Sequence, residues 1–164
     1  MIRICTDRDF DSILDIINDG AQAYKGIIPQ DRWHEPYMDR LELRREIEDG
    51  VVFYGCEEKD ALVGVMGIQD RGDVSLIRHA YVRTTHRNHG IGSRLLELLG
   101  STTAKPLLVG TWAAASWAIA FYESKGYTLL PAREKERLLR KYWSIPQRQV
   151  DTSVVLAGPG WPLP

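Results

Sequence analysis

The stretch that decides the fold is Arg87-Asn88-His89-Gly90-Ile91-Gly92, which runs directly into Ser93-Arg94-Leu95-Leu96-Glu97-Leu98-Leu99. An apolar, strand-like run at residues 74–82 precedes it, and apolar residues at helical spacing follow it. The two glycines therefore stand where a strand ends and a helix begins. The first turn of a helix offers unpaired backbone N–H groups and the positive end of the helix dipole, so this junction predicts an anion-binding site.

The motif alone does not identify the anion. Glycines let the backbone approach an anion closely, and Arg87 can add positive charge, with His89 or Arg94 as further candidates. The loop is not a P-loop, because no Gly-Lys-Ser/Thr follows the glycines. It is not a dinucleotide fingerprint either, because the first glycine of G-x-G-x-x-G is missing and no acidic residue ends a second strand about 20 residues on. A glycine-rich connection without a ligand remains an alternative.

Length and composition predict one soluble domain that spans residues 1–164. The formal net charge is −1 and no basic tail or stripe occurs, which argues against a nucleic-acid partner. No apolar run is long enough to span a membrane and no secretion signal is visible, so we expect a cytoplasmic protein without a membrane partner. Cys5 and Cys56 are expected to be free thiols in a reducing compartment.

Hydrophobic periodicity predicts the other elements in order. Helices are expected at residues 10–20, 38–49, 91–99, 112–125 and 131–141. Strands are expected at residues 3–5, 51–56, 62–68, 74–82, 107–109, 127–130 and 152–156. Short turns join the three strands between residues 51 and 82, which predicts an antiparallel meander. Residues 21–36 show little periodicity and hold Tyr24, Trp33 and His34, as is typical of a long functional loop.

This order of elements, together with two motifs, resembles the GNAT family of acetyl-CoA-dependent N-acetyltransferases. The segment from Tyr81 to Gly92 is similar to that family's Arg/Gln-x-x-Gly-x-Gly/Ala pyrophosphate loop. Residues 118–127, Ala-Ile-Ala-Phe-Tyr-Glu-Ser-Lys-Gly-Tyr, are similar to its Ala-x-x-Phe/Leu-Tyr-Glu-x-x-Gly-Phe/Tyr segment. The resemblance covers residues 51–130. It implies an α+β fold of three layers, in which a mixed, mostly antiparallel sheet is splayed at the cofactor site and carries helices on both faces.

The resemblance also implies the activity and the cofactor contacts. The protein would be an acyltransferase that moves an acetyl group from acetyl-CoA, its co-substrate, to a primary amine of a small molecule or peptide. Acetyl-CoA would lie between the strand that ends at Val82 and the strand at residues 107–110, with backbone groups near Tyr81 and Val82 pairing with the pantetheine arm. The loop residues expected to bind it are Arg87, Asn88, His89, Gly90, Ile91, Gly92 and Ser93.

One position departs from the family pattern. The family often has an asparagine about seven residues before the helix tyrosine, and this sequence has Ala115 there, with Ser116 as a candidate substitute. Two other classes of function stay open, and this departure gives room to the first of them. The first is a non-catalytic acyl-CoA-binding or regulatory module on the same fold. The second is a nucleotide-binding α/β domain, which would prefer ATP or NAD to CoA.

The catalytic candidates follow from the chemistry and the resemblance together. An amine must lose a proton before it attacks a thioester, and the departing thiolate benefits from gaining one. Tyr122 matches the family tyrosine that often acts as general acid, and an ordinary core tyrosine is the alternative. His79 on the central strand is the candidate base. His34 and Glu35 are rivals, and a chain of water molecules is a further alternative.

The acceptor site is expected at the long loop, where Trp33, His34 and Glu35 would contact the substrate. Several carboxylates, at Asp31, Glu35, Glu42 and Glu46, could attract a cationic amine or form a solvated face. Both cysteines are far in sequence from the cofactor loop, so direct attack in a ternary complex is expected rather than an acyl-enzyme. The histidines lack clustered ligand spacing, which predicts no metal site. A homodimer would be compatible with the apolar C-terminal strand.

Overall fold

The computed structural model describes residues 1–162. Within them, seven strands form one sheet in the order β1-β2-β3-β4-β5-β7-β6. The strands are β1 (Ile2–Ile4), β2 (Val52–Glu58), β3 (Ala61–Asp70), β4 (Ser75–Val82), β5 (Leu107–Trp112), β6 (Thr128–Leu129) and β7 (Ser153–Ala157). Strands β4 and β5 run parallel, and the other neighbouring strands in this part of the chain run antiparallel. The sheet is therefore mixed and mostly antiparallel, as predicted.

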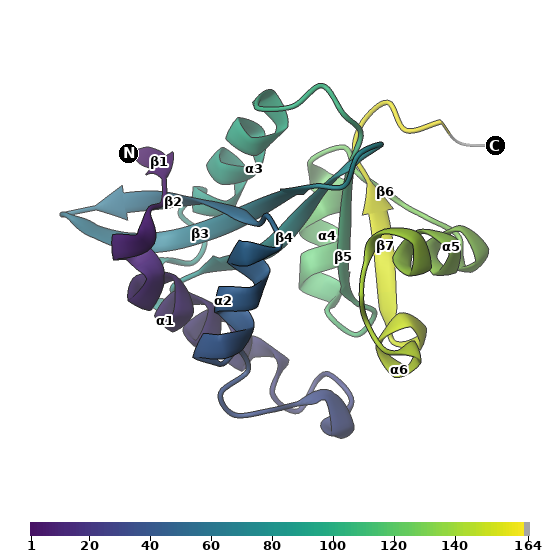
Figure 1. Ribbon diagram of the computed structural model, residues 1–164, viewed down its shortest axis with the longest axis horizontal. Helices are drawn as coiled ribbons and strands as arrows, with labels where there is room; N and C mark the ends of the chain where they lie inside the picture. The colour runs from purple at the N-terminus through teal and green to yellow at the C-terminus, as the bar shows by residue number, and fades with distance from the viewer. Residues whose placement is uncertain (163–164) are drawn as a thin grey trace.

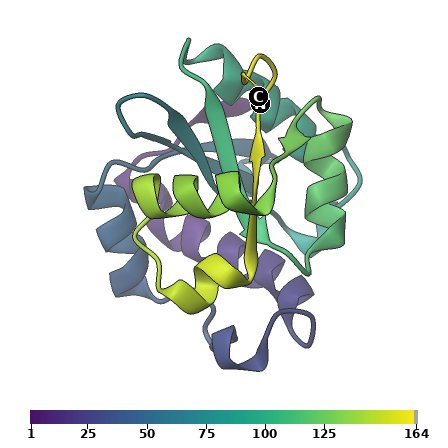
Figure 2. The ribbon, with the colours of Figure 1, turned by 90° about the vertical axis from the view of Figure 1, so that its right-hand side faces the viewer.

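Helices cover both faces of the sheet and make three layers (Figures 1 and 2). The helices are α1 (Phe10–Gly20), α2 (Arg40–Glu48), α3 (Ile91–Ser101), α4 (Ser116–Ser124), α5 (Ala132–Tyr142) and α6 (Gln147–Asp151). Short 3-10 turns precede or link them: η1 (Asp7–Asp9), η2 (Ala21–Tyr24), η3 (Gln30–Arg32) and η4 (Thr84–His86). Helices α3 and α4 cover one face. The other face carries α1 and α2 over one half of the sheet and α5 and α6 over the other.

Side-chain alternation along the strands explains this division. Successive residues of a strand point to opposite faces, so neighbouring positions join different clusters. Ile77 and Val109 pack in the cluster under α3 and α4, whereas Leu76 and Leu108 pack in the cluster under α5. The apolar stripe of α1 includes Ile13, Ile16 and Ile17, which are almost fully buried where α1 packs against β3 and β4.

The two halves of the sheet separate between β4 and β5. These strands pair only from Ser75–Leu107 to Ile77–Val109. Beyond that point β4 stays paired with β3, and β5 stays paired with β7, so the strands diverge (Figure 1). We call the opening beyond Ile77 and Val109 the strand gap. It confirms the splayed sheet that the family resemblance implied.

A bulge in β4 lies beside the strand gap. The β3–β4 register shifts between Val65 and Gly67, so His79 and Ala80 together lie opposite the single residue Met66. His79 has a positive φ of 54°, which is uncommon for a residue other than glycine. The bulge therefore re-aims the backbone and the His79 side chain where the two halves of the sheet part.

Several predicted boundaries differ from the structure. Strand β5 continues to Trp112, and α4 begins at Ser116, although residues 112–125 were expected to be helical. The alanines at 113–115 favour a helix, but Thr111 and Trp112 pair with β7, and this long-range pairing overrides the local preference. Strand β6 has only two residues, and the pattern did not predict α6.

The structure also bears on the cysteines and on membrane spans. Cys5 and Cys56 are both free thiols, as predicted. In the part of the chain that the structure describes, no helix combines the length and the apolar character needed to cross a membrane.

Candidate active site

The glycine loop lies at the surface, where β4 leads through η4 into α3. Asn88 and Gly90 both have positive φ angles, 64° and 75°, and Gly90 is the N-cap of α3. Across the described residues, the main-chain N–H groups of positions 87–93 have no hydrogen-bond acceptor. A run of free amides around left-handed residues forms a concave nest that binds anions. The local geometry therefore matches the predicted anion site.

Basic side chains surround this nest. Arg87 and His89 are exposed beside it, and His86 lies 3.6 Å from Glu58. Arg94, in the first turn of α3, contacts the Cys56 sulfur at 3.4 Å. A Cβ added at Gly92 would lie 3.4 Å from the Phe121 ring, which is an ordinary van der Waals contact, so α4 packs directly against the start of α3.

The free edge of β4 leads from the nest into the strand gap. Arg83 donates its N–H to the carbonyl of Val63 at 2.8 Å, and Tyr81 pairs with Val65. Because main-chain groups alternate in direction along an antiparallel strand, the N–H and C=O of Val82 face the gap. Val82 thus presents its main chain where a pantetheine arm was predicted, whereas the main chain of Tyr81 faces β3.

A cavity of about 150 Å³ occupies the strand gap and continues between the α1–α2 loop and the α5–α6 segment. We call it the gap cavity. Its lining residues are Tyr24, Tyr37, Ile77, Arg78, His79, Ala80, Tyr81, Val109, Gly110, Thr111, Trp112, Ala118, Tyr122, Leu139, Trp143, Ile145, Gln149 and Ser153. Both catalytic candidates are among them. The cavity therefore brings together residues from both faces of the sheet.

Tyr122 enters the gap cavity from α4, on the face that carries the glycine loop. Its side chain is buried, with its ring centroid 5.1 Å from that of Phe121 and 5.6 Å from that of Tyr127. Burial raises the pKa of Tyr122 well above its ordinary value. The hydroxyl thus keeps its proton at physiological pH and can donate a hydrogen bond into the cavity.

His79 lines the gap cavity from the β4 bulge. Its ring stacks against Phe53 at 6.1 Å, and its Nε2 lies 3.5 Å from a Glu46 oxygen on α2. This Nε2 is buried and makes no hydrogen bond within the described chain. Burial lowers the pKa of His79, so the ring is neutral near pH 7. A neutral imidazole can accept a proton.

Glu46 also holds Arg78 in the same wall. Arg78 donates to Glu46 at 3.0 Å and to Gln69 at 2.7 Å. Burial pushes the pKa of Glu46 upward, but His79 and Arg78 outweigh this effect and leave its pKa below the ordinary value. The carboxylate next to His79 is therefore ionised at neutral pH.

The three residues predicted to contact the acceptor are placed differently from the tyrosines of the same loop. Trp33 packs at the outer wall with its ring 5.8 Å from Tyr37, and His34 is exposed. Glu35 is exposed and forms an ion pair with Lys25 at 3.0 Å. None of the three lines the gap cavity as the structure describes it. The loop contributes Tyr24 and Tyr37 to that wall instead.

The sequence did not predict the part of the gap cavity that the α5–α6 segment forms. Trp143, Ile145 and Gln149 reach the cavity from the α5–α6 segment, which connects β6 to β7. The ring of Trp143 lies over Gly110 of β5, where an added Cβ would be 3.3 Å away. The one indication in the sequence was the apolar pair Trp143 and Ile145 just before Pro146.

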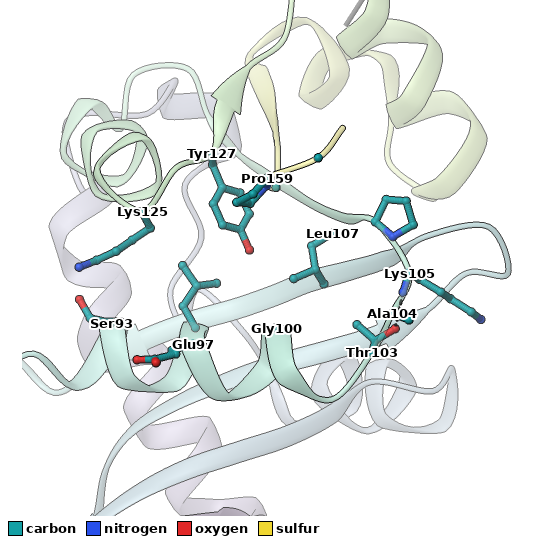
Figure 3. A pocket seen from close by; sticks show the side chains of 14 residues that line it. Ser93, Glu97, Gly100, Thr103, Ala104, Lys105, Leu107, Lys125, Tyr127 and Pro159 are labelled. Carbon is teal, nitrogen blue, oxygen red and sulfur yellow. Dashed lines mark hydrogen bonds between the residues drawn. The ribbon is translucent and has the colours of Figure 1, made fainter. Parts of the chain in front are cut away.

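A larger cavity of about 620 Å³ lies on the α3 face (Figure 3). Ser93, Glu97 and Gly100 form its α3 side, and Tyr127 and Pro159 stand opposite. It shares no lining residue with the gap cavity in the described structure, so neither catalytic candidate faces it. Through Ser93 it adjoins the glycine loop. The size of this cavity therefore does not identify the reaction site.

Comparisons with known proteins agree with this geometry. Residues 49–129 match the family model described as an acetyltransferase (GNAT) domain. The PaiA N-acetyltransferase of Thermoplasma acidophilum, solved in complex with coenzyme A, superposes with a TM-score of 0.71 at 14% identity, covering 96% of this chain and 97% of that chain. The ribosomal-protein-S18-alanine N-acetyltransferase of Escherichia coli superposes with a TM-score of 0.65 at 17% identity, covering 100% of this chain and 98% of that chain.

A third structure, the ribosomal-protein-alanine N-acetyltransferase of Brucella melitensis, gives a TM-score of 0.61 at 23% identity, covering 80% of this chain and 86% of that chain. At these identities the structures show a shared fold. A search of curated proteins finds no significant match to the sequence. Residues 49–129 thus carry a GNAT acetyltransferase domain, as the two motifs predicted, and the chain as a whole has the fold of the GNAT acetyltransferase structures.

Proposed function

We propose that the protein is an acetyl-CoA-dependent N-acetyltransferase that moves an acetyl group to a primary amine by direct attack in a ternary complex. One observation carries the proposal. The cavity that holds Tyr122 extends along β4 as far as Tyr81, Val82 then offers main-chain groups in the strand gap, and the free amides at 87–93 follow, which together give the proposed cofactor path. The coenzyme A in the Thermoplasma acidophilum structure supports a CoA thioester as the ligand.

The residues along this path fit acetyl-CoA. A diphosphate needs several N–H donors and nearby positive charge, which the 87–93 nest and Arg87 offer. The pantetheine arm carries amides that can pair with a free strand edge, and Val82 offers main-chain groups in the strand gap. Ala115 stands where the family often has an asparagine. It is fully buried in the turn before α4, and its methyl side chain supplies no polar contact.

The chemistry requires one proton to leave the amine and one to reach the sulfur. Bound acetyl-CoA supplies the thioester whose carbonyl carbon the amine attacks, which forms the C–N bond and breaks the C–S bond. His79 would take the proton from the incoming ammonium, and the Glu46 carboxylate would stabilise the imidazolium. Tyr122 would donate its proton to the departing sulfur.

Two observations support direct attack over an acyl-enzyme. Cys56 is buried and lies outside the gap cavity as described. Burial raises the pKa of Cys5 to about 12, so this thiol is not a nucleophilic thiolate at neutral pH.

Thiol release from acetyl-CoA with a panel of amines tests the proposal. We expect acetyl-CoA to bind in a calorimetric titration and CoA to be released only when an amine is present. Tight binding without release across the whole panel would indicate a non-catalytic acyl-CoA-binding module. Stronger binding of ATP or NAD than of CoA would instead overturn the assignment of the 87–93 nest.

A further inference from the structure

The acceptor side of the gap cavity has aromatic and aliphatic walls. Tyr24 and Tyr37 lie with ring centroids 5.5 Å apart, and the Trp112 indole donates to the Tyr37 hydroxyl at 2.8 Å. Trp143 and Ile145 form the opposite wall. Such walls bury an apolar body, and their ring faces attract an ammonium group.

The charges of this cavity disfavour a second positive group on the substrate. No Asp or Glu lines it within the described residues, and its charged lining residue there is Arg78, because His79 is neutral near pH 7. None of the four carboxylates that the sequence suggested for amine binding lines this cavity as described. Three of them form ion pairs with other residues: Asp31 with Arg148, Glu35 with Lys25 and Glu46 with Arg78. Burial raises the pKa of the fourth, Glu42. A distal ammonium would therefore lie near Arg78 and would find no carboxylate in the wall to pair with.

An ion pair joins the two walls. Arg148 of α6 donates from Nε and from its second terminal nitrogen to the two oxygens of Asp31 in η3, at 3.1 and 3.2 Å. Asp31 belongs to the loop that carries Tyr24 and Tyr37, and η3 and α6 lie side by side in both ribbon views (Figures 1 and 2). We call this contact the Asp31–Arg148 bridge. Gln149, next to Arg148 in α6, lines the gap cavity, so the bridge lies close to the acceptor side of that cavity.

The volume sets a similar limit. Protein cavities of about 150 Å³ bind ligands of the size of benzene, and the gap cavity has about that volume. Part of this space must also take the acetyl group. The body of the acceptor is therefore small.

Given the proposed acetyl transfer, we infer that the acceptor is a compact monoamine with an aromatic or branched aliphatic body, and that polyamines and peptide chains are excluded. The inference rests on the proposed function and specifies its substrate class. The aromatic walls, the missing carboxylate and the Asp31–Arg148 bridge carry it together.

Steady-state kinetics with four acceptors test this class: 2-phenylethylamine, isopentylamine, spermidine and an alanine-initiated tripeptide. We expect kcat/KM for the first two to exceed that for the last two by tenfold or more. A preference for spermidine or the tripeptide would overturn the substrate class and leave acetyl transfer intact. If acetyl-CoA binds but none of the four amines causes CoA release, the result would count against both the substrate class and the proposed acetyl transfer.

Variants of the bridge test the size limit. Arg148→Ala removes the contact with Asp31 and should raise kcat/KM for the tripeptide, relative to that for 2-phenylethylamine, at least threefold. Arg137→Ala is the matched control, because Arg137 pairs with Glu134 on the exposed side of α5. An unchanged ratio in Arg148→Ala would show that the bridge does not limit access.

Variants of the wall test the binding of the amine body. Trp143→Ala should raise KM for 2-phenylethylamine about tenfold, while the Kd of acetyl-CoA stays unchanged. Trp143→Phe keeps an aromatic wall and should keep KM within threefold of the original value. If Trp143→Ala leaves KM unchanged, the α5–α6 wall does not bind the acceptor and the inference fails.

Discussion

Burial sets the protonation states of Tyr122 and His79, the two residues on which the proposed chemistry depends. Burial raises the pKa of Tyr122 and lowers the pKa of His79, because it disfavours the charged form of each. Both side chains are therefore neutral near pH 7. A neutral tyrosine donates a proton and a neutral histidine accepts one, so the cavity holds both an acid and a base.

Replacing Tyr122 with phenylalanine tests the acid. The change removes the hydroxyl and keeps the ring, so we expect kcat to fall about a hundredfold. The Kd of acetyl-CoA, measured by calorimetry, should change little. Tyr127→Phe is the control, because Tyr127 is a buried neighbour of Tyr122 that lines the larger cavity on the α3 face instead of the gap cavity. Unchanged turnover in Tyr122→Phe would exclude the acid role.

Replacing His79 with glutamine tests the base through the pH profile. The lowered pKa keeps the imidazole neutral below its ordinary value of about 6.5, so kcat/KM should fall only at pH values below that point. In His79→Gln the inflection caused by the imidazole should disappear, and kcat/KM should rise steadily with pH toward the pKa of the amine, because only the unprotonated amine then reacts. An inflection that persists at the original pH in His79→Gln would assign it to another group.

At the scale of elements, the junction of β4 and α3 forms the proposed diphosphate site. Gly90 has a φ of 75°, and the space where a Cβ would stand is open. Gly90→Val should weaken acetyl-CoA binding at least tenfold, because a β-branched residue strains this conformation and occupies the nest. Gly72→Val is the matched control, since Gly72 has a φ of 83° and open space in the β3–β4 turn. Equal affinities in both variants would refute the nest.

The first strand and helix are joined by an ion-pair cluster that affects stability. Arg3 donates to both oxygens of Asp9 and to Glu57, and Asp9 also accepts the N–H of Thr6 at 2.8 Å. The Arg3 hydrogen bonds lower the pKa of Asp9 to about 2. A lowered pKa in the folded state stabilises the protein above the unfolded-state pKa of about 3.9, and this stabilisation is lost as pH falls toward 2.

Asp9→Asn should therefore lower the free energy of unfolding by about 2 kcal/mol at pH 7. The difference between the variant and the original protein should shrink as pH falls from 4 to 2. Urea denaturation at several pH values measures both effects. Asp7→Asn, at an exposed position of the same turn, should leave stability nearly unchanged. A constant deficit across this pH range would contradict the ion-pair explanation.

At the scale of the whole molecule, the sheet consists of two halves that pair only between Ser75–Leu107 and Ile77–Val109. A ligand in the strand gap contacts both halves and would tie them together. At a concentration of 100 times its Kd, acetyl-CoA should stabilise the fold by about 2.7 kcal/mol and raise Tm by about 5–10 °C. Hydrogen exchange should slow at Val82, whose amide faces the gap. Unchanged exchange there, despite tight binding, would contradict pairing along β4.

The sequence by itself determined the features that depend on neighbouring residues. The glycines and polar residues at 87–93 specify a strand-to-helix turn with free amides, and hydrophobic periodicity specified most helices and strands. Both motifs and the order of elements were enough to identify the family. Prediction failed at Trp112 and in the short β6, where pairing with β7 sets the boundary.

Only the tertiary structure decided the acceptor site. Tyr24 and Trp143 reach one cavity from distant parts of the chain, and Asp31 and Arg148 form a bridge across 117 positions of sequence. The predicted contacts at His34 and Glu35 are exposed instead. Such a wall forms because two helical segments pack on the same face of a divided sheet. No local pattern encodes that packing, since its residues meet only after the two halves of the sheet have assembled.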